Sequence, residues 1–453
     1  MTEQLTLGRP EVTPPGRWAF PLPTTHALPS GLTVHAYHVP GQYVVSARLV
    51  VPMTTRDEAR DKEGVAQLMT RLLDEGTSQH TTEEFTEALE RQGIAFGAGL
   101  SDGGMHVDID VPQRRLAEAL ALMCAAVAEP SFPEREVRRL VRVRLAEIDQ
   151  ERAAAPFRGA KELAATFFHA DERASRPTGG TTVTVASLTR EDIVDFHRAH
   201  VGPTHATLVL AGDLDGVDVP ELVHAAFGAW SPAVDLAAPA PVVARRAEDA
   251  ARIVLVDRPG SVQSEITVAW EGPDRHVQPA WAAYPVLGFV LGGSPSSRVD
   301  ALLREDKGYT YGMRSAFRPR RAGGLFATTG SVRTEVTAEA LQLLVGILSD
   351  ARSGFTEQEC RDGVDFIRNT APGRFAMADA IADEASAMVL DGLPLTFTSD
   401  NLDAMGRLRP ADLDTAYRRF VDGRWCIVIV GDAAAYTDAI RALDLAPVSV
   451  VPN

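Results

Sequence analysis

The chain has 453 residues, of which 45% are hydrophobic and 23% charged, and its formal net charge is −16. This length suits two large domains better than one core. The negative charge argues against nucleic acid and anionic membrane surfaces as partners, because both attract lysine and arginine. No run of about eighteen apolar residues is present, so we expect no transmembrane helix.

The start of the chain and its cysteines indicate a cellular compartment. Residues 1–18 contain no basic segment followed by an apolar stretch, so we expect no secretory signal. The three cysteines, Cys124, Cys360 and Cys426, stand far apart in apolar surroundings, which is typical of reduced, buried thiols. We therefore expect a cytoplasmic protein.

Each half of the chain opens with apolar strand patterns and continues with helices of 3.6-residue spacing. In the first half the patterns predict strands at 33–39 and 44–52 and helices at 82–93 and 113–129. In the second half they predict strands at 252–257 and 265–272 and helices at 279–293 and 337–354. Strict strand–helix–strand alternation is missing, which indicates α+β domains with largely antiparallel sheets.

The sequence contains an internal duplication. Residues 186–215 form a capped helix and then an apolar strand that stops at Gly-Asp, and residues 406–434 repeat this pattern. The helical segment 131–145 is echoed by 354–369 at nearly the same offset. Several features in the same order at one spacing indicate two homologous domains.

A segment rich in alanine and proline separates the two copies. It has no apolar period, so it is typical of a semi-extended surface linker. We predict a first domain at residues 1–232, a linker at 233–250 and a second domain at 251–453.

Four passages, taken in chain order, resemble the insulinase (pitrilysin) family of zinc peptidases. These passages are residues 28–51, 64–77, 176–215 and 292–317. The resemblance covers almost the whole chain, and it implies a pair of homologous domains joined by a linker. In the bacterial two-subunit enzymes of this family, two such chains enclose a peptide chamber. One chain supplies the zinc, and the other supplies groups that hold the substrate.

The zinc motif of the family, His-x-x-Glu-His, is missing from this chain. Two histidines four residues apart share a helix face and bind one zinc, and the glutamate activates water. The aligned positions here are Gln67, Thr70 and Arg71, and arginine places a permanent cation where the metal would sit. Glu147 matches the third ligand. We read it as an acid that pairs with Arg71 or a neighbour, the alternative being a relic of the metal site. No metal is expected in this chain.

The histidines do not offer another metal site. His197 and His200 could share a helix face, but no glutamate lies between them, and we expect an ordinary surface or helix-end role for both. His35 and His38 lie three apart in a predicted strand and so face opposite sides of it.

The resemblance assigns the family's substrate-holding arginine and tyrosine to Arg304 and Tyr311. Arg304 ends a predicted helix, Gly308 breaks it, and residues 309–311 are expected to begin a strand. A guanidinium and a phenol can both donate hydrogen bonds to peptide carbonyls and to a developing oxyanion.

Two other interpretations of this pair stay open. In the first, Arg304 pairs with Glu305 or Asp306 at a helix end while Tyr311 packs in a core. In the second, Tyr309 stands in for Tyr311, because residues two apart in a strand face the same side.

Two neighbouring segments also bear on substrate binding. Gly292, Gly293 and Ser294 match a glycine-rich loop that touches substrate in the family, although a glycine pair is also a common helix stop. Active subunits of the family pair their substrate with an edge strand near residues 100–111. The glycines and acidic residues there suggest that this chain does not present that strand.

Our hypothesis is a substrate-binding subunit of a heterodimeric zinc peptidase that cleaves unstructured peptides. The zinc would lie in a homologous partner with an intact His-x-x-Glu-His motif, and Arg304 and Tyr311 would act at that site. The alternative is an inactive scaffold or peptide-binding protein, in which both residues would be dispensable.

Overall fold

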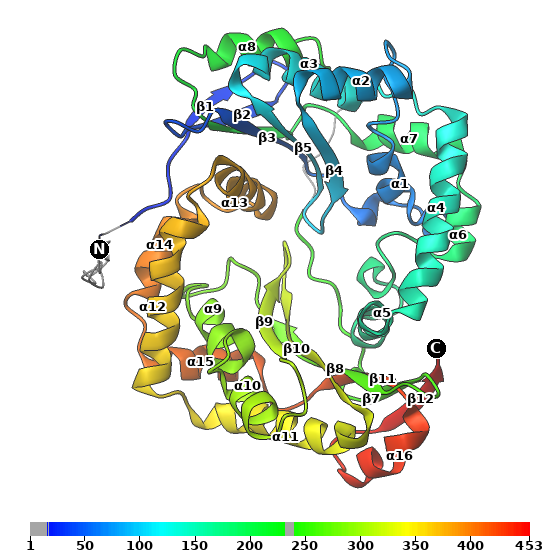
Figure 1. The fold of residues 1–453 in the computed structure, drawn as a ribbon, viewed down its shortest axis with the longest axis vertical. Coiled ribbons are helices and arrows are strands. Elements are labelled where there is room, and N and C mark those ends of the chain that lie inside the picture. Colours follow the sequence, from blue (N-terminus) through cyan, green and yellow to red (C-terminus); the bar gives the residue numbers. More distant parts are fainter. Residues whose placement is uncertain (1–15, 17, 232–239) are drawn as a thin grey trace, which may run out of the picture.

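In the computed structural model, residues 16, 18–231 and 240–453 are described (Figure 1). The N-terminal segment that was assessed for a secretory signal lies almost entirely outside the described residues, as do positions 233–239 of the predicted linker. Residues 240–250 belong to the described part, where Arg246 forms an isolated β-bridge with Phe168. The predicted domain boundaries themselves stay a prediction.

The described residues of the first half form a six-stranded sheet in the order β1-β2-β6-β3-β5-β4. Only β2 and β6 run parallel; the other neighbours are antiparallel. The strands are β1 (Thr24–Ala27), β2 (Thr33–His38), β3 (Val44–Val51), β4 (Ala95–Leu100), β5 (Met105–Pro112) and β6 (Thr207–Gly212).

The second half forms a sheet with the same arrangement of its inner strands, in the order β12-β7-β11-β8-β10-β9. The two sheets differ at one edge, because β12 comes from the end of the chain and runs parallel to β7, whereas β1 runs antiparallel to β2. The strands are β7 (Ile253–Asp257), β8 (Gln263–Gly272), β9 (Arg314–Pro319), β10 (Gly324–Arg333), β11 (Cys426–Gly431) and β12 (Val448–Pro452).

Helices flank both sheets, which confirms the predicted pair of largely antiparallel α+β units. Those of the first half are α1 (Val65–Arg71), α2 (Thr82–Gln92), α3 (Leu116–Ala128), α4 (Glu134–Ala153), α5 (Ala155–Phe167), α6 (Thr182–Ala186), α7 (Arg190–His200) and α8 (Val219–Phe227). Those of the second half are α9 (Ala283–Gly288), α10 (Arg298–Asp300), α11 (Thr337–Asp350), α12 (Glu357–Arg374), α13 (Ala378–Asp391), α14 (Phe397–Met405), α15 (Pro410–Phe420) and α16 (Ala433–Ala442).

The duplication read from the sequence corresponds to matching elements. The first copy of the capped helix and strand is α7 and β6, and the second copy is α15 and β11. Thr189 caps α7 by accepting the backbone N–H of Asp192, whose carboxylate in turn accepts the N–H of Thr189. The echoed helical segments are α4 and α12, each of which follows a helix that packs on its own sheet.

One helix from each half packs on the sheet of the other half. Helix α5 from the first half packs on β8 and β11, and α13 from the second half packs on β3 and β6 (Figure 1). The α13 contact is apolar, with Ile381 and Ala385 buried against Tyr37 and Val209 of the first sheet. This reciprocal exchange fixes the two halves against each other through buried apolar surface.

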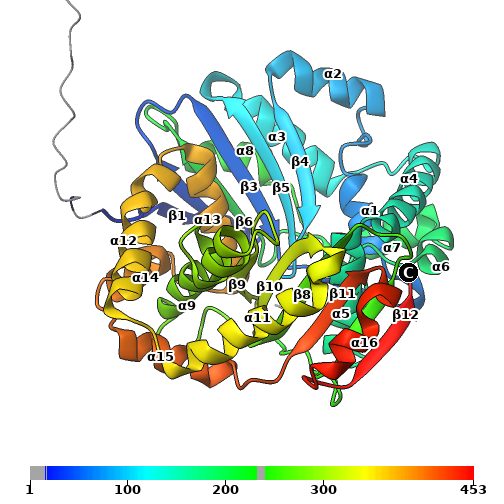
Figure 2. The same cartoon turned by 60° about the horizontal axis from the view of Figure 1, so that its bottom comes forward.

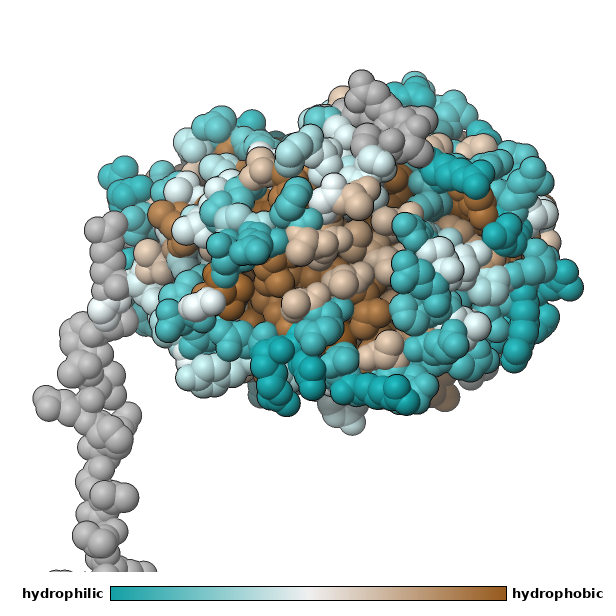
Figure 3. Space-filling view, turned by 90° about the horizontal axis from the view of Figure 1, so that it is seen from above, coloured by the Kyte–Doolittle hydropathy of each residue, from teal (hydrophilic) through white to brown (hydrophobic). Residues whose placement is uncertain are grey.

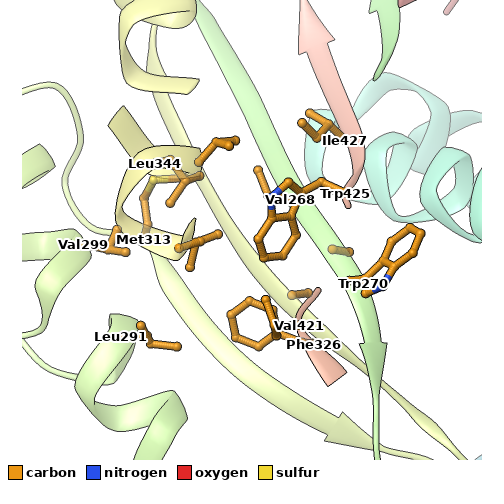
Figure 4. Packing of buried hydrophobic residues seen from close by; sticks show 14 of the residues in the cluster. Val268, Trp270, Leu291, Val299, Met313, Phe326, Leu344, Val421, Trp425 and Ile427 are labelled. Atoms are coloured by element: carbon orange, nitrogen blue, oxygen red, sulfur yellow. The ribbon is translucent and has the colours of Figure 1, made fainter. Parts of the chain in front are cut away.

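The outer faces of both sheets are covered by helices of their own half. Figure 2 shows α11 and α16 over the second sheet. Figure 3 looks onto the side of the molecule that carries α3 and α8, where hydrophobic residues gather between hydrophilic ones. The core of the second half packs Trp270, Phe326 and Trp425 between sheet and helices (Figure 4). In the part of the chain described here, no helix is long and apolar enough to cross a membrane.

Candidate functional site

The short helix α1 occupies the position of the expected zinc motif. Its start is fixed by Glu58, a buried residue whose carboxylate accepts the backbone N–H groups of Gly64 and Ala66 at 2.9 and 3.0 Å. Burial raises the pKa of Glu58, while the ion pair with Arg173 at 2.7 Å opposes that shift. Leu68 and Met69 face the core of the first half. The helix is therefore anchored at its start and along its buried face.

Arg71 and Glu147 are brought together, as the sequence suggested. The two Nη atoms of Arg71 each donate to one carboxylate oxygen of Glu147, both at 2.8 Å. Arg144 donates to the same carboxylate at 3.2 Å. The hydrogen bond from Arg71 is the largest cause that lowers the pKa of Glu147. The prediction that Glu147 pairs with Arg71 is confirmed.

The other two motif positions have no metal-binding chemistry. The hydroxyl of Thr70 is buried and donates to the carbonyl oxygen of Ala66 at 2.8 Å. Gln67 offers a neutral amide next to Gly179. A zinc site needs deprotonated sulfur, nitrogen or carboxylate donors. Among the four motif positions only Glu147 is a carboxylate, and the guanidinium of Arg71 already binds it. These residues do not fit a zinc ion.

The histidine pair on α7 has separate environments. His197 is buried, its Nε2 lies 2.8 Å from the carbonyl oxygen of Val127, and its ring meets that of Phe132 edge-on. Burial lowers the pKa of His197. His200 instead lies against Phe196. Over residues 16, 18–231 and 240–453, no group of three or more His, Cys, Asp or Glu residues could hold a metal ion.

Arg304 lies near the end of a helical run, as expected, but the segment after it differs from the prediction. The run comprises α10 and a π-helical segment, Ala301–Asp306. Residues 309–311 form a loop rather than the start of a strand, and β9 begins only at Arg314. Gly308 and Gly312 have φ angles of 62° and 146°, which interrupt extended backbone on both sides of these residues.

The side chain of Arg304 is 40% exposed, and it forms an ion pair with the neighbouring Glu305 at 3.3 Å. An exposed pair of this kind contributes little and leaves most of the guanidinium donors available. One part of the alternative interpretation, pairing with Glu305, is thus present. The interaction does not prevent Arg304 from binding a carbonyl or carboxylate.

Tyr311 does not pack in a core, because it is 94% exposed. Tyr309 is half-buried, packs against the core of the second half, and hydrogen-bonds to Glu339, which raises the pKa of its phenol. The guanidinium of Arg333 lies 6.0 Å from the ring of Tyr309 and donates to the carbonyl oxygen of Gly308 at 2.8 Å. The expectation that the two tyrosines share one strand face is wrong, and only Tyr311 projects freely.

The segment Gly292–Ser294 closes a π-helical turn, Phe289–Gly293, so the predicted helix stop is confirmed. Gly292 packs against the first residues of β9: an added Cβ would lie 2.5 Å from Ser315 Oγ. Gly293 is exposed and Ser294 is buried, with its Oγ 3.2 Å from Ser296 Oγ. Contact of these residues with a substrate stays a prediction.

The sequence argument about the edge strand concerned the wrong strand. Residues Met105–Pro112 form β5, which pairs on both sides, with β3 and with β4. Among the described strands the edge at this end of the sheet is β4, Ala95–Leu100, which pairs only with β5. The acidic residues of β5 therefore say nothing about how the edge is presented.

Sequence reasoning missed Asp300, a fully buried acid that holds the chain just after Tyr311. The available signal was an acidic residue directly after Val299 on the apolar side of the helical run. A buried carboxylate in that position needs a partner, and the partner turned out to be the loop that carries Tyr311.

Comparisons with known proteins show which family this chain resembles. The profile of the "Insulinase (Peptidase family M16)" matches residues 33–181, and that of the "Peptidase M16 inactive domain" matches residues 187–365. An uncharacterized zinc protease of Mycobacterium leprae is 27% identical over 74% of this chain and 75% of its own length. One of Streptomyces coelicolor is 25% identical over 89% of this chain and 88% of its own length.

Solved structures have the same fold. A peptidase M16 inactive domain from Pseudomonas fluorescens superposes with a TM-score of 0.81 at 23% identity, covering 90% of this chain and 97% of that one. A protease from Helicobacter pylori gives a TM-score of 0.82 at 17% identity, covering 90% and 99%.

Proposed function

Because the chain belongs to the insulinase family (peptidase M16), we propose that it is the non-metal subunit of a two-chain zinc peptidase. In this proposal it hydrolyses no peptide alone. It docks with a homologous chain that carries an intact His-x-x-Glu-His motif, and it supplies Arg304 and Tyr311 to the substrate bound there.

The observation that carries the proposal is the contrast between a closed metal position and an open donor pair. On α1 the ion pair of Arg71 with Glu147 fills the place of the ligands. On the loop after Arg304, Tyr311 is 94% exposed although the residues on both sides of it are held by hydrogen bonds. The exposed phenol of Tyr311 leaves its hydroxyl available to donate a hydrogen bond to a partner or substrate, which supports the proposal.

The chemistry available to the two side chains matches a peptide substrate. The guanidinium of Arg304 and the hydroxyl of Tyr311 can donate hydrogen bonds to a peptide carbonyl and to the oxyanion that forms when water attacks it. Donors placed at a developing oxyanion give large rate effects because they bind the transition state better than the ground state.

The zinc of the complex would belong to the partner chain, where it would supply the activated water. This chain would hold and orient the substrate, with Gly292, Gly293 and Ser294 as further candidates for contact. We take an unstructured peptide as the substrate class, because an enclosed chamber between two chains admits extended polypeptide. The cytoplasmic location stays a prediction.

The test is a cleavage assay on mixtures of unstructured peptides, using this chain alone, a zinc-bearing homologue alone and the pair. We expect cleavage only by the pair, and Tyr311→Phe should lower kcat/KM by about tenfold or more. Tyr43→Phe is the matched control, because Tyr43 is also a solvent-exposed tyrosine, at 67%, but lies in the first half. A pair that cleaves equally well with Tyr311→Phe would contradict the proposal and favour the scaffold alternative.

A further inference from the structure

Residues 298–304 belong to the helical run that ends near Arg304, and Asp300 is the only acid among them. Its side chain is fully buried. Its backbone N–H is donated to Ser297 Oγ, which caps the run. Removing a carboxylate from water is costly unless hydrogen bonds and an opposite charge compensate it. The partners of this carboxylate therefore indicate what its burial achieves.

Both partners lie in the chain that follows Tyr311. Oδ1 of Asp300 accepts the backbone N–H of Met313 at 2.8 Å, and Oδ2 accepts Nη1 of Arg314 at 3.1 Å. Arg314 is 61% exposed on its side chain, so water still reaches the cation while the acid is shielded. One buried side chain thus joins the helical run to the end of the loop.

The loop between these contacts has little freedom left. The side chain of Met313 is fully buried and belongs to the same core cluster as Val299 and Leu291 (Figure 4). Gly312 adopts a φ of 146°, and a Cβ there would lie 3.4 Å from Asp300 Oδ2. Thr310 Oγ1 accepts the N–H of Gly312 at 3.1 Å and lies 3.2 Å from its carbonyl oxygen. The backbone on both sides of Tyr311 is fixed, and only its side chain is free.

We propose that Asp300 is a positioning residue that sets where the Tyr311 hydroxyl stands relative to Arg304. Asp300 lies on the same helical run as Arg304, four residues earlier, so a single carboxylate connects the two proposed substrate-binding groups. The inference rests on the proposed function and deepens it. A well-packed apolar residue would often stabilise such a site as well as a buried ion pair does, so the charge serves geometry more than stability.

The test uses the active pair and compares Asp300→Ala and Asp300→Asn with wild type, each alone and combined with Tyr311→Phe. Asp300→Ala should lower kcat by about tenfold, with a much smaller change in KM, at temperatures well below its melting point. In the Tyr311→Phe background Asp300→Ala should lower kcat by less than about a further twofold, because the hydroxyl that Asp300 positions is already gone. Asp300→Asn keeps an oxygen for the Met313 N–H and should lose less activity.

Two further measurements separate positioning from general destabilisation. Hydrogen exchange of the Met313 amide should accelerate in Asp300→Ala while the amides of α12 keep their protection. Asp213→Ala is the matched control: Asp213 is a buried acid of the first half that accepts the Gly41 N–H at 2.8 Å. It should lower the melting temperature and leave kcat unchanged.

The outcomes distinguish the two proposals. If Tyr311→Phe lowers kcat but Asp300→Ala lowers it by the same factor in both backgrounds, or has no effect on kcat, the positioning role is overturned and the proposed function stands. If Tyr311→Phe itself changes nothing, the proposed function fails and the positioning role falls with it. Should Asp300→Ala not fold, Asp300→Asn and its combination with Tyr311→Phe decide the question by the same comparison.

Discussion

Two arginines near the ends of short helical segments show how differently this chain uses the same side chain. Arg71 on α1 and Arg304 on the run before the Tyr311 loop have similar side-chain exposure, 31% and 40%. Arg71 makes two hydrogen bonds of 2.8 Å to one carboxylate on another helix, whereas Arg304 forms an ion pair with its sequence neighbour Glu305. The guanidinium of Arg71 is used in a structural ion pair, whereas that of Arg304 can still bind a substrate.

The difference teaches that exposure alone does not identify a functional arginine. A bidentate pair of an arginine with a carboxylate uses the donors that would recognise a substrate. The position of the family's metal site is therefore a helix–helix contact in this chain. Arg304 and Tyr311, which we propose as the substrate-holding pair, have side chains that are 40% and 94% exposed, and this exposure is the basis of our proposal.

The largest expected effect in the two-chain cleavage assay comes from removing Arg304, with the removal of Arg71 as the comparison. Arg304→Ala should lower kcat/KM by about tenfold to a thousandfold, as the loss of an oxyanion donor does. Arg71→Ala should change it by less than about twofold, because it removes only a partly exposed structural ion pair. Equal losses for the two variants would contradict the distinction between them.

A second prediction concerns the packing that supports the Arg304 region. Gly292→Ala places a methyl group 2.5 Å from Ser315 Oγ and 2.7 Å from the Ser315 nitrogen, so the backbone must shift. We expect a loss of about 1–3 kcal/mol in the free energy of unfolding, measured by urea denaturation. Gly346→Ala is the control, because a Cβ there meets nothing within 4 Å in helix α11 and should be neutral or stabilising. An unchanged free energy of unfolding for Gly292→Ala would show that the backbone here can shift at little cost and would contradict the prediction.

A third prediction sharpens the description of α1. A double-mutant cycle with Arg71→Met and Glu147→Gln should give a coupling free energy of about 0.5–1 kcal/mol, the range for partly exposed ion pairs. Arg144 also binds Glu147, so Glu147→Gln alone should cost more than Arg71→Met alone. No coupling within error would mean that the pair does not hold α1 against α4 in solution.

The smallest effect is the pH dependence of that coupling. The folded pKa of Glu147 is lowered below its ordinary value of 4.5, chiefly by the hydrogen bond from Arg71. The stabilisation is therefore fully present above pH 4.5 and is lost as the pH falls through the lowered folded value. The stability difference between wild type and Arg71→Met should shrink over this acid range. A difference that stays constant into acid would exclude the charge of Glu147 as its source.

The sequence predicted the fold well where the signal was local or repeated. The strands β2, β3, β7 and β8 follow apolar patterns, and the duplication correctly indicated two similar α+β units. It did not predict that α5 and α13 each pack on the sheet of the other half, because an apolar helix face does not show which sheet it will cover.

For the candidate site, some predictions from the sequence were confirmed and others were wrong. The Arg71–Glu147 pair followed from opposite charges at two family positions. The predicted strand at 309–311 failed because positive φ angles at Gly308 and Gly312 turn the chain into a loop, which an alternating pattern does not reveal. Asp300 was missed because one of its two partners is a backbone N–H, a group that every non-proline residue carries.

The most direct test of the central claim is zinc binding by the purified chain alone, measured by equilibrium dialysis and followed by a peptide-cleavage assay with and without the zinc-bearing homologue. We predict that the isolated chain retains no tightly bound zinc and cleaves nothing, and that cleavage appears when the homologue is added. An equimolar amount of tightly bound zinc, together with cleavage by the isolated chain, would contradict the account.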